Sequence, residues 1–82
     1  MPTVLRERGF QIRIYTNDHE PMHVHAVKGG DVVVINLGDE DDLPYVRENH
    51  GLKPAEVRLA LEIVTAQQAF LIEEWRRIHD ES

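Results

Sequence analysis

The chain has 82 residues, no cysteine, 15 Asp or Glu and 9 Lys or Arg, so its formal net charge is −6. This length predicts a single domain, and the lack of cysteine excludes disulfides and thiolate metal sites. The acidic excess argues against an extended nucleic-acid surface, because such binding requires cations that neutralise phosphates. No segment approaches the roughly 18 apolar residues of a membrane span. The first residues contain no apolar run of signal-peptide length, so we expect a cytoplasmic protein.

Residues 1–37 are expected to form an antiparallel sheet. Alternating or continuous apolar patterns predict strands at residues 10–15, 23–28 and 32–37. Val4 and Leu5 are candidates for a short earlier strand paired with the first of these. A tight turn at Gly29-Gly30-Asp31 joins the last two strands into a hairpin. The final strand is apolar on both faces, which is typical of a strand covered on both sides.

The second half of the chain predicts a connector and a helix. Residues 38–52 begin with an acidic run and show no apolar period, so we expect an irregular connector. Pro54 suits the first position of a helix, and residues 53–80 carry apolar side chains spaced by three and four. The expected buried seam of this helix consists of Val57, Leu61, Val64, Gln68, Leu71, Trp75 and Ile78.

We therefore predict a small α+β domain over residues 1–82, with a three- to four-stranded antiparallel sheet packed against one long C-terminal helix. A helix of about 25 residues spans roughly 37 Å, whereas a strand of about six residues spans roughly 20 Å, so the helix overshoots the sheet. Val32, Val34 and the outer flank of the helix leave an apolar surplus. This surplus predicts a homodimer, or dependence on another protein partner.

Three of the five histidines lie within seven residues, at His19, His23 and His25, with two carboxylates beside them. His23 and His25 are two apart on a predicted strand, so their side chains leave the same face, which we expect to be open to solvent. A short turn brings His19 near them. Imidazole and carboxylate ligands suit a divalent transition metal such as zinc. The predicted metal ligands are His19, His23, His25 and Glu20, with Asp18 as a further ligand or as a partner of one.

Two other interpretations of these histidines stay open. Without a metal, His23 and His25 would act as acid and base, and Arg13 on the neighbouring strand would steady an anion. In the structural interpretation, the histidines only brace the turn and set the hairpin register. A match to the nucleotide-binding histidine triad is excluded, because Val27 stands where the third histidine belongs.

Several segments together resemble a known family. The most specific is Asp18-His19-x-Pro21-x-His23-Val24-His25, and the others are Met1-Pro2-Thr3-Val4, Gly9-Phe10, Ile14-Tyr15, Asn49-x-Gly51-Leu52 and Trp75. They resemble short bacterial proteins grouped as domain of unknown function 4160. The resemblance covers almost the whole chain, and it carries over His19, His23 and His25 as the motif histidines.

The resemblance also implies a partner. The genes of that family often neighbour those of a second uncharacterised family, domain of unknown function 2442, in an arrangement similar to toxin–antitoxin pairs. The leading hypothesis is therefore a component of a toxin–antitoxin-like pair that contacts a small protein encoded nearby. The alternatives are a small metal-binding protein or metal-dependent hydrolase, and a purely structural interaction module. If the protein is an enzyme, we expect His23, His25 and Arg13 to be its catalytic residues.

Overall fold

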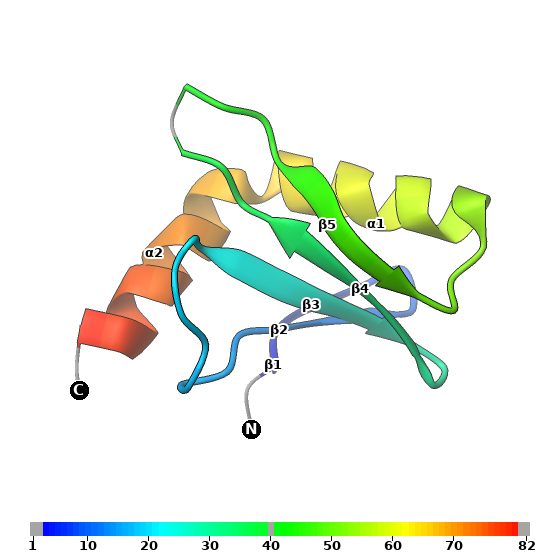
Figure 1. Ribbon diagram of the computed structural model, residues 1–82, viewed down its shortest axis with the longest axis horizontal. Helices are drawn as coiled ribbons and strands as arrows, with labels where there is room; N and C mark the ends of the chain where they lie inside the picture. Colours follow the sequence, from blue (N-terminus) through cyan, green and yellow to red (C-terminus); the bar gives the residue numbers. More distant parts are fainter. Residues whose placement is uncertain (1–2, 40, 81–82) are drawn as a thin grey trace.

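The computed structural model describes residues 3–39 and 41–80; the ends of the predicted domain and Glu40 of the acidic connector lie outside the described residues. This part of the chain is an α+β domain with one antiparallel sheet and two helices (Figure 1). The strands are β1 (Thr3–Glu7), β2 (Phe10–Arg13), β3 (His23–Lys28), β4 (Asp31–Asn36) and β5 (Tyr45–His50). The helices are α1 (Pro54–Ala66) and α2 (Gln68–Asp80). The strands lie side by side in chain order, which makes β3 the central strand.

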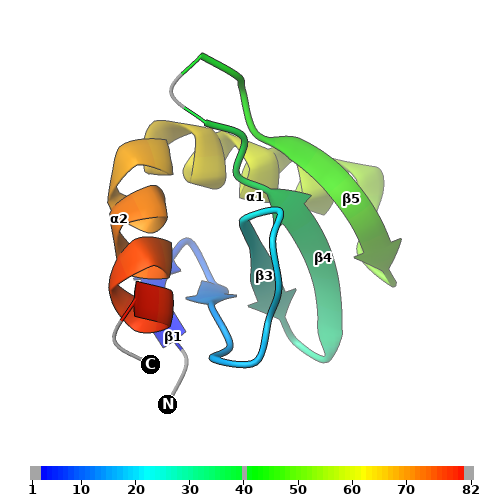
Figure 2. The same cartoon turned by 60° about the vertical axis from the view of Figure 1, so that its left-hand side comes forward.

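The helices cover one face and one end of the sheet. Figure 1 shows α1 behind the strands, and Figure 2 shows α2 turning away from α1 along the end of the sheet. No helix lies across the other face within residues 3–39 and 41–80, but Trp75 of α2 reaches the ring of His23 at one end of it. The buried core between sheet and helices consists of Phe10, Ile12, Ile14, Val24, Ala26, Val33, Ile35, Leu37, Leu52, Ala60, Ile63, Val64, Leu71, Ile72 and Trp75. The predicted burial of Trp75 is thereby confirmed.

The hairpin of β3 and β4 sets which side chains enter the core. Gly29 in its turn has φ of +65°, a left-handed conformation that glycine adopts without steric cost. Because side chains alternate along a strand, Val24 and Ala26 enter the core and are 0% exposed. His23 and His25 consequently leave the opposite face, as the sequence predicted.

The number of strands corrects the sequence prediction. The sheet has five strands, not three or four, and the additional strand β5 lies within the predicted irregular connector. All six residues of β5 are exposed, so no apolar alternation marked it in the sequence. β5 is held in the sheet by backbone pairing with β4. This pairing contains a β-bulge on β5, between Val46, which pairs with Ile35, and Glu48, which pairs with Val34. A strand of this kind depends on its neighbour rather than on its own side chains.

The C-terminal helix is also different from the prediction. Residues 53–80 do not form one helix; the chain breaks at Gln67, which ends α1 with φ −109° and ψ 17°. Pro54 begins α1 as predicted. The break allows α2 to follow the end of the sheet instead of overshooting it (Figure 2). Within residues 3–39 and 41–80, neither helix has the length and apolar character required to cross a membrane.

Gln68 ties the break between the helices to the acidic connector. Its Nε2 lies 2.8 Å from the carbonyl oxygen of Leu37, 3.0 Å from that of Asp39 and 2.6 Å from that of Asp42. A side-chain amide has only two N–H groups, so three oxygens share two donors. The predicted seam residue Gln68 is therefore a polar anchor that fixes the start of α2 against the segment after β4.

Gln68→Ala should lower the free energy of unfolding by about 1–2 kcal/mol, because the carbonyl oxygens lose their shared donor while two of the three bonds are exposed enough for water to replace them. The matched control is Gln67→Ala, whose side chain makes no hydrogen bond among the described residues. It should change stability by less than about 0.5 kcal/mol. Chemical denaturation of both variants checks this prediction, and equal losses would contradict the anchoring role.

Candidate metal centre

The turn before β3 presents the carboxylate of Asp18 toward the strand. The backbone N–H of Asp18 donates to the carbonyl of Tyr15 at 3.1 Å, and Asp18 Oδ2 accepts the N–H of Tyr15 at 3.3 Å. From α2, the Nε2 atom of His79 lies 3.1 Å from the carbonyl oxygen of Asp18, and its Nδ1 lies 2.9 Å from that of Trp75. Contacts from both sides of the turn therefore hold Asp18 in position.

His23 is buried and has a fixed orientation. Its Nδ1 lies 2.8 Å from the carbonyl oxygen of Pro21. A carbonyl oxygen can only accept a hydrogen bond, so Nδ1 must carry a proton and donate it. In the neutral ring, Nε2 then carries a lone pair, and this atom faces Asp18 Oδ2 at 3.5 Å. The indole of Trp75 covers the ring, with centroids 5.3 Å apart. The expectation that both strand histidines are open to solvent is wrong for His23, which is 6% exposed because α2 packs over it.

His25 lies beside His23 and is only partly buried. Its Nδ1 is 3.7 Å from Asp18 Oδ2, and this buried atom has no hydrogen-bond partner among the described residues. The ring of Tyr15 meets it edge-on, with centroids 4.8 Å apart. Burial lowers the pKa of the His25 imidazole, an effect that the Asp18 carboxylate opposes and that the neighbouring cationic groups reinforce. A lowered pKa favours the neutral imidazole, the form that binds metals.

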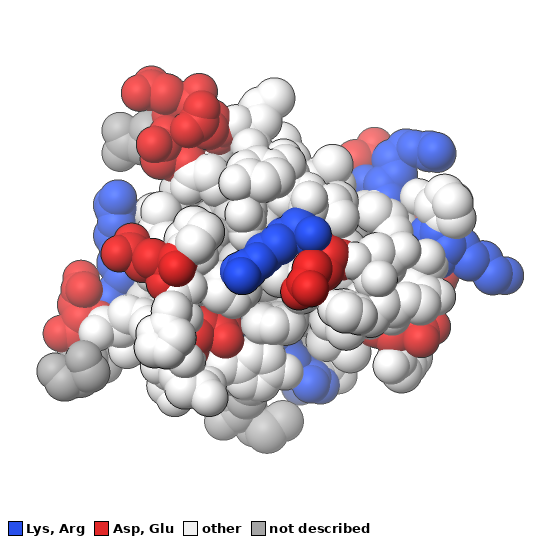
Figure 3. Space-filling model, in the orientation of Figure 1, with Lys and Arg blue, Asp and Glu red and all other residues white. Residues whose placement is uncertain are grey.

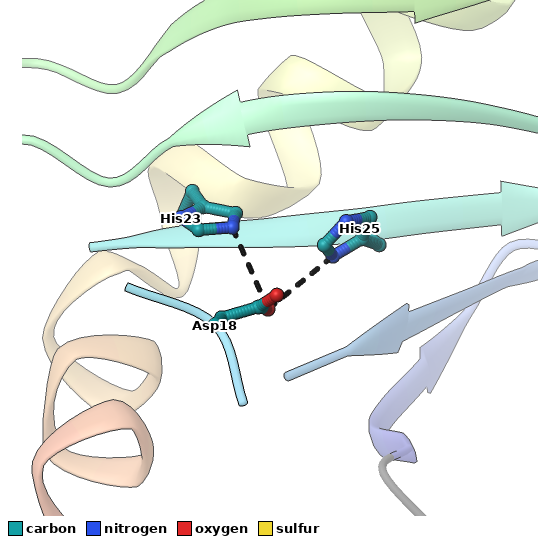
Figure 4. Close-up of side chains that lie close together, drawn as sticks. All are labelled: Asp18, His23 and His25. Atoms are coloured by element: carbon teal, nitrogen blue, oxygen red, sulfur yellow. Dashed lines mark ion pairs between the residues drawn. The ribbon is translucent and has the colours of Figure 1, made fainter. Parts of the chain in front are cut away.

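The three side chains converge on one point. Figure 4 shows Asp18, His23 and His25 pointing toward one another, and their ligand atoms lie within 4.8 Å of one another. The separations of 3.5 and 3.7 Å to Asp18 exceed a good hydrogen bond of roughly 2.7–3.2 Å. Two ligands about 2.1 Å from a tetrahedral ion stand about 3.4 Å apart. The two separations to Asp18 are thus compatible with ligands of one shared ion.

The contact between His23 and Pro21 also fits a metal site. Metal-binding histidines almost always donate their second ring N–H to a carbonyl or carboxylate, which fixes the tautomer and the ring orientation. Two imidazoles and one carboxylate suit zinc, iron or manganese, and three protein ligands leave at least one coordination position open.

The structure does not gather all of the predicted ligands. His23 and His25 join the group, whereas His19 and Glu20 are exposed and do not belong to it. They line a neighbouring groove of about 530 Å³ together with Trp75, Arg76 and His79, among other residues. The sequence suggested Asp18 only as a further ligand or as a partner of one. In the structure, Asp18 supplies the carboxylate of the cluster with His23 and His25.

One contact of the site was missed in the sequence. Asp18 and His79 are 61 residues apart, and no local pattern predicts their contact. Asp18 was a candidate because it stands beside the histidines, and its place in the Thr16-Asn17-Asp18 turn fits its hydrogen bond with the backbone of Tyr15. Arg13, predicted to be near the site, is paired in register with His25, so the two side chains share a face.

The fold and site define a small α+β protein with a two-histidine, one-carboxylate cluster on the central strand of its sheet. The chain belongs to the family described as Domain of unknown function (DUF4160), whose model matches residues 9–76. The family resemblance in the sequence is thus confirmed. No curated protein and no solved structure matches the chain.

In metal-free protein, the His25 imidazole should titrate below its ordinary pKa of about 6.5, because burial disfavours the charged form. A lowered folded-state pKa means that the unfolded chain binds the proton more tightly. This contribution to stability is therefore complete above about pH 6.5 and is lost as the pH falls through the folded-state value. NMR titration of the imidazole protons checks the pKa, and melts of His25→Gln check the linkage. A pKa above that of an unfolded histidine would show that Asp18 outweighs burial.

Proposed function

We propose that this chain is a small metal-binding protein whose centre consists of Asp18, His23 and His25. The observation that carries the proposal is the orientation of His23. In the neutral ring, Nδ1 donates to the Pro21 carbonyl and the Nε2 lone pair faces a carboxylate oxygen at 3.5 Å. Two electron-rich atoms at this separation attract a cation between them, and either a metal ion or a proton on Nε2 can fill that role. The nearby Nδ1 of His25, buried and without a hydrogen-bond partner among the described residues, supplies a third ligand atom.

The activity that such a site fits best is metal-dependent hydrolysis. A metal with an open position supplies Lewis acidity and lowers the pKa of a bound water toward neutrality. The chain's own residues orient this centre: Pro21 fixes His23, Tyr15 holds Asp18, and Trp75 excludes water from one side of the ring.

The metal-free alternative, in which His23 and His25 act as acid and base, has weaker geometric support. Each nitrogen is farther from Asp18 than a good hydrogen bond allows, so the carboxylate is not placed to orient either ring for proton transfer. The structural interpretation is weakened as well, because the buried Nδ1 of His25 braces nothing among the described residues.

Zinc titration of untagged protein by calorimetry tests the proposal. Wild type should bind one equivalent of zinc. Loss of a hydrogen bond that only supports a metal ligand weakens metal binding by roughly 10- to 100-fold. Asp18→Asn or His25→Gln removes a ligand itself and should therefore weaken zinc binding by more than this. The matched controls are His19→Gln and His50→Gln, which change exposed histidines outside the group and should stay within about twofold of wild type. Thermal melts without metal separate lost ligands from lost folding.

The outcomes separate the competing sites. Wild-type protein that ignores zinc, nickel and manganese at neutral pH contradicts the metal centre. A variant of His19 that loses binding as fully as His25→Gln would move the site to the ligand set predicted from the sequence.

The proposal of a protein partner has different support. The outer edge of β5 is unpaired within the described residues, its six residues are exposed, and Leu43 just before it is 75% exposed. An edge strand presents unpaired backbone N–H and C=O groups that another chain can pair with. Val34 no longer supports this proposal, because it is only 5% exposed within the single chain. The toxin–antitoxin-like role and the cytoplasmic location stay predictions, which no feature of the described residues favours or opposes.

Light scattering tests self-association through this edge. At high micromolar concentration, the purified protein should have twice the mass of one chain, because a paired β5 edge satisfies backbone groups that otherwise bind water. A monomer with a cooperative melt would contradict the homodimer and leave only a different protein as the partner.

A further inference from the structure

Arg13 lies beside the candidate metal centre, and its guanidinium can donate more hydrogen bonds than it makes among the described residues. It is paired in register with His25 across β2 and β3, so both side chains rise from the same face of the sheet. Its Nη2 donates to Gln11 Oε1 at 2.7 Å, and its Nη1 lies 3.5 Å from the hydroxyl of Tyr15. Its Nε is buried without a hydrogen-bond partner among the described residues. Gln11 therefore holds the guanidinium in place, and the nearby Tyr15 hydroxyl adds only a long contact; neither neutralises its charge.

A second guanidinium, that of Arg47, comes from the edge of the sheet, two strands from His25, which pairs with Val34. Arg47 lies at the β-bulge of β5, where Val34 pairs with Glu48 and Ile35 with Val46, so Arg47 has no partner in the register. Its charge, like that of Arg13, acts on His25 and helps to lower the pKa of that imidazole. Figure 3 shows the face of the molecule that is turned away from α1, where basic and acidic side chains are interspersed.

Neither guanidinium forms an ion pair with a carboxylate in residues 3–39 and 41–80. This is unexpected in a chain with 15 acidic and 9 basic residues, where carboxylates outnumber the cations available to them. The nearest acidic residue along β5, Glu48, faces His50 at 3.9 Å instead. Arg13 and Arg47 therefore leave a local positive charge on a protein that is acidic overall.

A bound divalent ion would increase this charge. Asp18 contributes one negative charge, a divalent ion two positive charges, and the two arginines two more, which leaves a net charge of about +3 at the site. An anion with two negative charges and several oxygens would neutralise most of it. Arginine is well suited to such a ligand, because its planar fork of N–H groups matches pairs of phosphate or carboxylate oxygens.

We propose that the metal-loaded site binds a phosphate-type oxyanion, with one oxygen at the open metal position and the others held by Arg13 and Arg47. The proposal rests on the metal centre proposed above and narrows its substrates to phosphate monoesters. Both arginines act as binding residues, and Tyr15 and Gln11 are positioning residues for Arg13.

Calorimetric titration of inorganic phosphate into protein loaded with one equivalent of zinc tests this proposal. Wild type should bind phosphate, and Arg13→Gln and Arg47→Gln should each weaken phosphate binding about tenfold or more, while zinc affinity measured on the same samples stays within about twofold. The matched control is Arg58→Gln, an exposed arginine on α1 that should bind phosphate like wild type. Arg47 is exposed, so its variant remains informative even if Arg13→Gln fails to fold.

The two proposals fail in different ways. Zinc-loaded wild type that binds no phosphate, or binds it equally well in both arginine variants, overturns the oxyanion site and leaves the metal centre intact. Acetate that binds more tightly than phosphate overturns it as well, because a monoanion would then suffice. Wild type that binds no metal overturns the proposed function together with this inference.

Discussion

Side-chain alternation along β3 is the constraint on which both the fold and the candidate site depend. One face of this central strand buries Val24 and Ala26 in the core, and the other presents His23 and His25. A slip of one residue would exchange the two sets, placing imidazoles in the core and apolar side chains at the site. Pairing with both neighbouring strands prevents such a slip. Any account of the histidines therefore begins with the register of this strand.

The rest of the site is assembled from distant parts of the chain. The turn before β3 contributes Asp18 and the carbonyl that orients His23, and α2 contributes Trp75 and His79, whose rings stack with centroids 3.9 Å apart. Packing of α2 against the end of the sheet excludes water from one side of the cluster. The break at the start of α2 is what allows this packing, so the bend of the helix and the environment of His23 are coupled.

Much of the sheet could be predicted from the sequence, because its apolar side chains alternate where strands are half-buried. The hairpin turn at Gly29 and the helix start at Pro54 follow from residue types with strong backbone preferences. The strand β5 could not be predicted, since its exposed residues carry no apolar pattern. Neither could the break at Gln67, because no Gly or Pro stands there to mark it in the sequence.

The segment that contains the cluster of Asp18, His23 and His25 could be predicted, but only part of the cluster's composition. Two histidines on alternate positions of a strand must share a face, so His23 and His25 follow from spacing alone. The choice among Asp18, His19 and Glu20 depends on the path of the turn, which spacing does not define. Hydrogen bonds between Tyr15 and Asp18 direct the aspartate toward the strand and leave its two neighbours exposed.

The central claim is that Asp18, His23 and His25 bind one metal ion together. A crystal structure of the zinc-loaded protein, with the ion located by its anomalous scattering, tests it most directly. We expect a single strong peak between β3 and the preceding turn, with the two imidazoles and the carboxylate each about 2.0–2.2 Å away and with His23 Nδ1 still bonded to the Pro21 carbonyl. An ion bound instead by His19 and Glu20 in the neighbouring groove, or no peak at this cluster, would contradict it.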